Sequence, residues 1–252
     1  NTYNTKGEIT FSGTKTLENR TLKAGEFSFE LYDSVGELLE AVTNAADGSY
    51  SFTTIKYTGT DLDTDDDGNY VETTKTYKVV EKTGDDSSVT YDTTEYEITV
   101  TLKDDGEGTI ETSADPKEDT YDFTNTYETE GEITLIGEKT LENRKLTEGE
   151  FSFELYDEDG TLLETVTTAA DGSYNFTTIK YTGDDLDKDS AGNYLETIKN
   201  YRVVEKAGED GSVTYDDTEY EITVTLTDNG KGTIEVTADP AEDSYDFTNT
   251  YN

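Results

Sequence analysis

The 252-residue sequence contains no cysteine and no histidine. Without cysteine the chain can form neither a disulfide bond nor a thiolate zinc site. Without histidine it lacks the usual general base of enzymes and the commonest metal ligand. The chain therefore lacks the side chains that most often catalyse turnover of an external substrate, and we expect a protein that is not an enzyme. Small secreted domains often rely on disulfides, and this chain needs some other source of stability.

Positive charge is also scarce, since 19 lysines and arginines face 59 acidic residues and give a net charge of -40. Such a chain repels nucleic acid and anionic membrane surfaces, so we expect neither as a partner. No apolar run is long enough to span a bilayer, and no signal peptide is visible. We expect no membrane insertion, and we expect any leader or anchor to lie outside this fragment.

Leucine, isoleucine, valine and phenylalanine make up only about a fifth of the sequence, which together with the net charge lies near the composition of disordered chains. The 19 tyrosines add apolar area. Most alternate within predicted strands, as core aromatics do, and a sugar- or protein-binding surface is the alternative. A core this thin leaves each domain dependent on an additional constraint.

The sequence repeats itself with a shift of 124 residues and no gap. Lys15 recurs as Lys139 and Glu81 as Glu205, while Asn1-Thr2-Tyr3 matches the end of each repeat. We therefore predict two domains, residues 4–127 and 128–252, with residues 1–3 as the tail of a preceding repeat. We expect the fragment to come from a longer tandem array.

Nearly every segment of each repeat alternates between apolar and polar residues with a period of two, as β-strands do. Phe27 and Phe29 share a face, for example, while Ser28 and Glu30 occupy the other. Seven or more short strands with turns about every ten residues predict an all-β sandwich in each repeat. One short helical turn is expected, near residues 58–62.

Three polar residues interrupt the inward-facing rows of the first repeat. Lys15 follows Phe11, Glu81 follows Tyr77 and Val79, and Asn125 lies between Phe123 and Tyr127; Lys139, Glu205 and Asn249 occupy the same places in the second repeat. Burial of a lone ionised lysine or glutamate costs several kcal/mol. The three side chains are therefore expected to satisfy one another.

Burial would give these residues a specific chemistry. It lowers the pKa of a lysine and raises that of a glutamate. A neutral Lys15 could then attack the amide carbon of Asn125, while a protonated Glu81 polarises the amide carbonyl and passes a proton to the departing ammonia. The product is a Lys–Asn isopeptide bond, formed once by the folded domain itself. The alternative is that Lys15 and Lys139 are ordinary strand lysines that reach out to solvent, and that Glu81 and Glu205 pair with neighbouring lysines.

Five segments of the first repeat resemble a known family, the streptococcal pilin isopeptide linkage domain. That family belongs to the collagen-adhesin B-type (CnaB) group of reversed immunoglobulin-like folds in Gram-positive surface proteins. The segments are Gly13-Thr14-Lys15-Thr16-Leu17, Gly25-Glu26-Phe27-Ser28-Phe29, Tyr77-Lys78-Val79-Val80-Glu81, Val89-Thr90-Tyr91-Asp92 and Phe123-Thr124-Asn125-Thr126-Tyr127. The resemblance covers essentially all of both repeats and implies two Ig-like β-sandwich domains in an elongated arrangement.

The resemblance assigns roles to the inward polar residues. It implies a cross-link between Lys15 and Asn125 with Glu81 as catalyst, and one between Lys139 and Asn249 with Glu205 as catalyst. The chain departs from the pilins of this family in lacking a pilin-type lysine motif and a sorting signal. That difference favours a repeat in the shaft of a large adhesin over a polymerised pilus backbone.

An acidic loop in the first repeat carries Asp61, Asp63, Asp65 and Asp67, followed by Gly68. Alternate carboxylates before a glycine resemble a calcium loop. The match is partial, because Thr74 occupies the place of the bidentate glutamate and Ala191 replaces one acid in the second repeat. A solvated acidic loop without metal is the alternative. No other cofactor is expected.

The sequence thus predicts a structural module, a self-cross-linked stalk of a bacterial adhesin or fimbria with mechanical and proteolytic resistance. We expect it outside the cell, on a protein anchored to the cell wall, and monomeric. Its partners would be neighbouring repeats of the same chain, and a host ligand would be bound by another domain. The alternative is that these domains themselves recognise a host protein or glycan.

Overall fold

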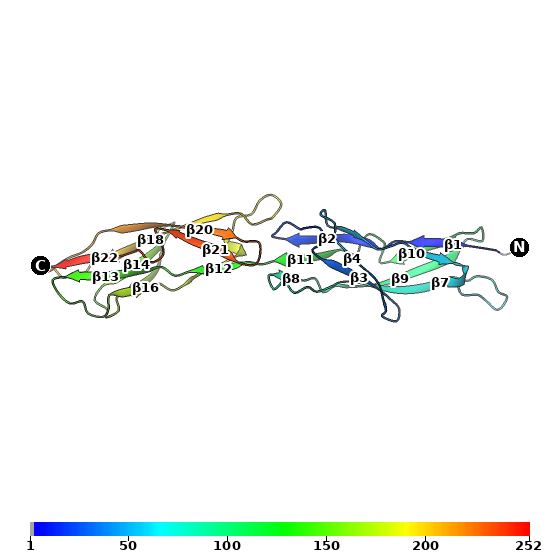
Figure 1. Ribbon diagram of the computed structural model, residues 1–252, viewed down its shortest axis with the longest axis horizontal. Helices are drawn as coiled ribbons and strands as arrows, with labels where there is room; N and C mark the ends of the chain where they lie inside the picture. The colour runs from blue at the N-terminus through cyan, green and yellow to red at the C-terminus, as the bar shows by residue number, and fades with distance from the viewer. Residues whose placement is uncertain (1–2) are drawn as a thin grey trace. The chain divides into compact units, whose positions relative to one another are not determined.

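The computed structural model describes residues 3–252, so the first two residues of the predicted tail lie outside the described part. The chain divides into two compact units, one ending at Tyr127 and the other beginning at Glu128. We call these unit 1 and unit 2. Each consists of β-strands with one short 3-10 turn (Figure 1), which confirms the predicted all-β fold class.

Unit 1 contains eleven strands within residues 3–127. They are β1 (Lys6–Ile9), β2 (Ser12–Glu18), β3 (Ser28–Asp33), β4 (Leu38–Thr43), β5 (Ser49–Ser51), β6 (Ile55–Thr58), β7 (Thr73–Glu81), β8 (Val89–Thr90), β9 (Glu95–Asp104), β10 (Ile110–Asp115) and β11 (Phe123–Tyr127). The 3-10 turn η1 (Gly59–Asp61) lies where the sequence predicted a helical turn.

Unit 2 repeats this order. Its elements are β12 (Glu130–Ile133), β13 (Ile136–Glu142), β14 (Ser152–Asp157), β15 (Leu162–Thr167), β16 (Ser173–Asn175), β17 (Ile179–Thr182), η2 (Gly183–Asp185), β18 (Thr197–Lys206), β19 (Val213–Thr214), β20 (Glu219–Asp228), β21 (Ile234–Asp239) and β22 (Phe247–Tyr251). Within the described residues, no helix has the length and hydropathy needed to cross a membrane.

Each unit is a sandwich of two main sheets. In unit 1 a five-stranded sheet has the order β10-β9-β7-β3-β4, a four-stranded sheet has the order β5-β2-β11-β8, and β1 pairs with β6 in a smaller ribbon. Unit 2 has the same three sheets. The first long strand and the last strand of each unit are parallel neighbours, with Lys15 opposite Phe123 and Leu17 opposite Asn125. The two ends of the unit therefore meet in one sheet.

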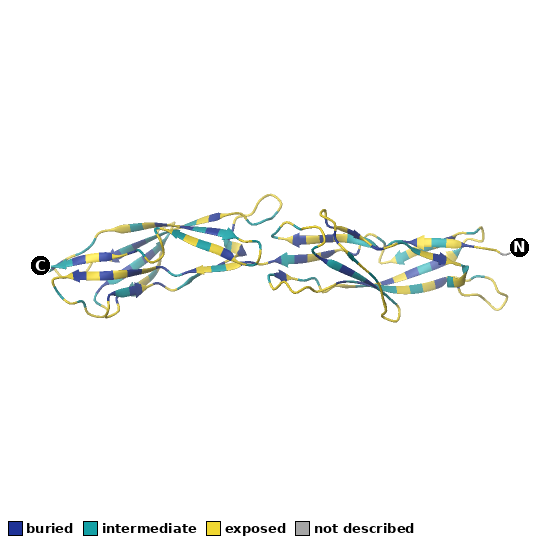
Figure 2. Ribbon diagram, in the orientation of Figure 1, coloured by how far each residue is buried: buried dark blue, intermediate teal, exposed yellow. Residues whose placement is uncertain are grey.

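The core follows from the period-two alternation, which turns every second side chain of a strand toward the facing sheet. Buried residues accordingly alternate with more exposed ones along many of the strands in Figure 2. Phe29 and Tyr50 stack across the sandwich with ring centroids 3.8 Å apart. The tyrosine hydroxyls stay partnered, as buried ones generally do: Tyr57 and Tyr77 pair at 2.8 Å, and Tyr50 donates to the carbonyl of Tyr121. Seven of the 19 tyrosines are buried in the core, and all but one of the others are half-buried.

Candidate isopeptide site

The four-stranded sheet supplies a buried lysine in each unit. Lys15 lies in the middle of β2, where alternation turns it inward, and it is only 2% exposed. Its backbone N–H donates to the carbonyl of Gly48 at 2.8 Å. Gly48 has a φ of +89°, and a side-chain carbon there would meet the carbonyl oxygen of Lys15. The glycine turn between β4 and β5 can therefore pack closely against the strand that positions the lysine.

The opposite sheet supplies a buried glutamate. Glu81 is the last residue of β7, and it lies opposite Phe29 of β3 in the strand register. Its Oε2 atom lies 2.9 Å from the Nζ atom of Lys15, and both side chains are completely shielded from solvent. The lysine Nζ also lies 4.7 Å from the centre of the Phe27 ring. The pair thus bridges the two sheets in an apolar surrounding.

The last strand supplies the third residue. Asn125 lies in β11 beside β2 and is wholly buried. Its Nδ2 atom donates to Oε1 of Glu81 at 2.7 Å, so the two carboxyl oxygens contact the lysine and the asparagine separately. Its Oδ1 atom accepts the backbone N–H of Asp92 at 2.7 Å. Lys15, Glu81 and Asn125 therefore form one hydrogen-bonded group, with the glutamate between the other two.

Burial sets the protonation of this group. Desolvation lowers the pKa of Lys15, and the hydrogen bond to Glu81 opposes that shift only in part. Desolvation likewise raises the pKa of Glu81 against the opposing effects of Lys15 and Asn125. Both shifts favour the uncharged forms, because an apolar interior penalises charge. Both shifts therefore act toward a neutral amine beside a protonated carboxyl group, which is the state that aminolysis of an amide requires.

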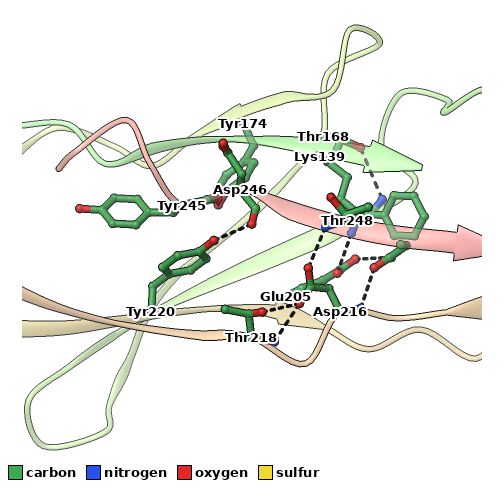
Figure 3. A network of polar contacts seen from close by, with 12 residues as sticks. Lys139, Thr168, Tyr174, Glu205, Asp216, Thr218, Tyr220, Tyr245, Asp246 and Thr248 are labelled. Atoms are coloured by element: carbon green, nitrogen blue, oxygen red, sulfur yellow. Dashed lines mark hydrogen bonds and ion pairs between the residues drawn. The ribbon is translucent and has the colours of Figure 1, made fainter. Parts of the chain in front are cut away.

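Unit 2 has the same arrangement. Lys139 Nζ lies 2.8 Å from Glu205 Oε2, and Asn249 Nδ2 donates to Glu205 Oε1 at 2.7 Å. Burial lowers the pKa of Lys139 and raises that of Glu205. Figure 3 shows Lys139 reaching toward Glu205 from the facing strand, with Asp216 and Thr248 beside them. The structure thus brings together all six residues that the sequence singled out for the two cross-links.

The structure differs from the expected geometry at the asparagine carbonyl. The proton of Glu81 was expected to polarise the carbonyl of Asn125. In the structure Glu81 instead contacts the amide nitrogen, and the carbonyl oxygen accepts the N–H of Asp92. Asp216 takes the same position at Asn249, also at 2.7 Å. Sequence reasoning gave Asp92 no role, because the contact is made by its backbone. Its recurrence in Val-Thr-Tyr-Asp at the same offset in both repeats was the available signal.

A comparison with protein-family models matches the Spy0128-like isopeptide containing domain (FctA) twice, over residues 11–128 and 135–252. The chain belongs to this family. It is a family of isopeptide-containing domains and not an enzyme family. The two family matches correspond to the two units, and each contains one lysine–glutamate–asparagine group.

A comparison with solved structures found two pilins and one further protein that are similar to the chain at low sequence identity. The major pilin from Streptococcus pyogenes is 15% identical, with 97% of this chain and 98% of that chain covered and a TM-score of 0.31. The shaft pilin spaA from Lactobacillus rhamnosus GG is 14% identical, with 98% of each chain covered and a TM-score of 0.26. The Bacillus anthracis TIE protein is 15% identical, with 98% of this chain and 34% of that chain covered and a TM-score of 0.28. A search of curated proteins found no match.

In the acidic loop at residues 61–69, the Asp61 and Asp65 carboxylates accept hydrogen bonds from nearby backbone N–H groups. Asp65 accepts the N–H groups of Asp67 and Asn69 at 3.0 and 2.8 Å, and Asp61 accepts that of Thr58 at 2.8 Å. In the described part of the chain, no group of three or more acidic side chains is arranged to hold a metal ion. The loop geometry is explained by turn capping alone, and calcium there stays a prediction.

Proposed function

We propose that each unit is a load-bearing structural module closed by a self-formed Lys–Asn isopeptide bond. The bond would join Lys15 to Asn125 in unit 1 and Lys139 to Asn249 in unit 2. The observation that carries this proposal is the fully buried group formed by Lys15, Glu81 and Asn125 and repeated in unit 2. The family match supports it, because the family is one of isopeptide-containing domains.

The chemistry uses only groups present in the site. Lys15 Nζ, as a neutral amine, attacks Cγ of Asn125 and forms the new C–N bond. The proton that the amine loses passes to Oε2 of Glu81, and the glutamate gives a proton from Oε1 to Nδ2, which leaves as ammonia when its bond to Cγ breaks. The glutamate ends as it began, and one amine plus one amide become one secondary amide plus ammonia. Its two oxygens already contact the nucleophile and the leaving group separately.

The buried lysine–glutamate pair argues for a reactive role over a stabilising one. A buried ion pair recovers its desolvation cost only with excellent geometry, and apolar residues of similar volume often serve stability as well or better. Both units nevertheless retain the pair, with asparagine as its third member. Conversion to an uncharged amide would remove the ionisable amine from the core.

The position of the bond would make each unit resist extension. Lys15 lies near the start of unit 1 in its second strand, β2, and Asn125 lies near the end of the unit in β11, the parallel neighbour of β2. A pulling force would therefore pass directly across the bond and leave the residues between them unstretched. Only the 14 residues from Asn125 to Lys139 could then extend between the two bonds, by at most roughly 50 Å.

We infer that the chain is part of the shaft of a fimbria or adhesin on the surface of a Gram-positive bacterium, outside the cell. Neighbouring repeats of the same chain would be its structural partners, and ligand recognition would belong to another domain. The cross-linked units supply what such a shaft requires, which is resistance to force and to proteases without a disulfide.

Single-molecule pulling tests the mechanical role. The wild-type chain should show no unfolding step of either unit. Glu81→Ala should release unit 1 alone, with a step of about 360–400 Å for the freed loop of roughly 110 residues. Glu97→Ala is the matched control, because Glu97 lies exposed on β9 away from the site. A wild-type chain that unfolds in two full-length steps would refute the proposal.

A further inference from the structure

The carbonyl of each reactive asparagine faces a backbone N–H group. The N–H of Asp92 donates to Oδ1 of Asn125 at 2.7 Å, and the N–H of Asp216 donates to Oδ1 of Asn249 at the same distance. A backbone N–H can only donate, so the amide atom that faces it must be the oxygen. This contact fixes the orientation of the buried asparagine, with its nitrogen toward the glutamate and its oxygen toward Asp92.

The N–H of Asp92 is held in place by the carboxylate of the same residue. Oδ2 of Asp92 accepts the N–H of Thr124, the residue immediately before Asn125, at 2.9 Å. Oδ1 accepts the N–H of Thr94, also at 2.9 Å. Asp216 repeats both contacts, with Thr248 at 2.7 Å and Thr218 at 3.0 Å. Asp92 is thus joined to β11 at two consecutive residues, which aims its N–H at the asparagine carbonyl.

We propose that the backbone N–H groups of Asp92 and Asp216 are the oxyanion-binding donors of the isopeptide reaction, and that their carboxylates are the positioning groups. This inference rests on the proposed formation of the bond. When Lys15 Nζ bonds to Cγ of Asn125, the electron pair of the C=O π bond moves onto Oδ1. The Asp92 N–H then faces a negative charge on the fully buried Asn125 side chain, where a fixed donor is most effective. The charge returns to re-form the carbonyl as ammonia leaves.

The charge of Asp92 has two opposite effects on the reactive state. Its negative field raises the pKa of Lys15, which opposes formation of the neutral amine, and it raises the pKa of Glu81, which favours the protonated carboxyl group. Burial opposes ionisation of Asp92, but the hydrogen bonds from Thr94 and Thr124 outweigh it and hold its pKa below the ordinary value. Because these two effects of the charge oppose each other, the hydrogen bonds that the carboxylate accepts from Thr94 and Thr124 are the better explanation of its presence in both units.

Replacement of one peptide N–H by an ester oxygen tests the donor directly. The full chain is made with an ester in place of the Tyr91–Asp92 amide, which deletes the N–H and keeps every side chain. A control chain carries the ester at Ser88, whose N–H donates to Asp86 in a nearby turn instead of to the asparagine. Synthesis is started in a reconstituted translation reaction and samples are quenched in denaturant at timed intervals. Mass analysis of proteolytic fragments then gives the cross-linked fraction of each unit separately.

The ester at Asp92 should slow the cross-link of unit 1 by about 100-fold relative to unit 2 of the same chain. The Ser88 control should leave both rates unchanged. Equal rates in the two units of the Asp92 ester would overturn the inference and leave the proposed bond standing. Absence of a cross-link in both units of the unsubstituted chain would instead overturn the proposed function and this inference with it.

Two further measurements separate catalysis from folding. In chains trapped before reaction by Glu81→Ala, the ¹³C resonance of the Asn125 side-chain carbonyl should move upfield when the Asp92 ester is introduced, because the carbonyl loses its donor. Asp92→Asn removes the negative charge but can accept only one of the two N–H groups, and it should slow unit 1 about tenfold. An unchanged carbonyl resonance, or an Asp92→Asn chain that reacts faster than wild type, would contradict the assignment.

Discussion

Asn125→Ala should remove the cross-link of unit 1 and lower the stability of that unit. The substitution removes the carbon that Lys15 would attack, yet it leaves Lys15 and Glu81 paired at 2.9 Å. The bond would close a loop of about 110 residues, for which the chain-entropy model gives about 4–5 kcal/mol. The substitution also removes the contacts of the buried amide with Glu81 and Asp92, at a further cost of about 1–3 kcal/mol.

For a unit of this size, each kcal/mol corresponds to about 4 °C in melting temperature. The entropic term alone should therefore lower the melting temperature of unit 1 by about 15–20 °C. Scanning calorimetry of the full chain measures this, with unit 2 as an internal reference. Asn249→Ala is the matched variant and should lower the melting temperature of unit 2 alone.

Asn125→Ala made in a Glu81→Gln chain separates the stability contributed by the bond from that contributed by the amide contacts. Glu81→Gln keeps the shape of the side chain but removes the group that carries the proton, so unit 1 of that chain should lack the bond. Adding Asn125→Ala there should cost only the 1–3 kcal/mol of the lost contacts. If Asn125→Ala costs the same in both backgrounds, the reasoning that assigns 4–5 kcal/mol to the cross-link is refuted.

Three further predictions follow from the site and its surroundings. Bond formation should slow at low pH, where the Lys15 amine is protonated, and at high pH, where Glu81 has no proton to give to the departing ammonia. Timed mass analysis across pH should therefore show a maximum in the rate of cross-linking, and a rate that only rises with pH would contradict this. Burial raises the pKa of Tyr50 and Tyr57 above the ordinary value of 10.0. Their contribution to stability is therefore fully present below pH 10.0 and is lost as the pH rises above it. Urea titrations at pH 8 and at about pH 11 should show a lower unfolding midpoint at the higher pH. Because Asp65 already caps its own loop, EDTA should leave both melting temperatures unchanged, and a clear drop would favour calcium.

Sequence patterning was sufficient for much of this site. A period of two places Lys15, Glu81 and Asn125 inward whatever the order of the sheets, because side-chain direction in a strand depends on position alone. The burial of all three agrees with that argument. The helical turn at Gly59–Asp61 was predictable for a similar local reason, since a glycine follows Thr58, whose N–H is capped by Asp61.

The remaining features depend on how the strands pack together. The division into sheets of five, four and two strands, and the parallel pairing of β2 with β11, arise from long-range register that no local pattern encodes. The orientation of the Asn125 amide was beyond sequence reasoning as well. It is set by a backbone N–H, and a backbone donor exists at almost every residue, so Asp92 could be assigned only from its position.

The intact mass of the purified chain tests the central claim most directly, measured beside Glu81→Ala and Glu205→Ala. Each isopeptide bond releases one ammonia, so the wild-type chain should be lighter than its sequence by two ammonia molecules. Each variant should be lighter by only one, and the variant with both substitutions should have its full sequence mass. A wild-type chain with its full sequence mass would contradict the account, and Lys15 and Lys139 would then be members of ordinary buried ion pairs.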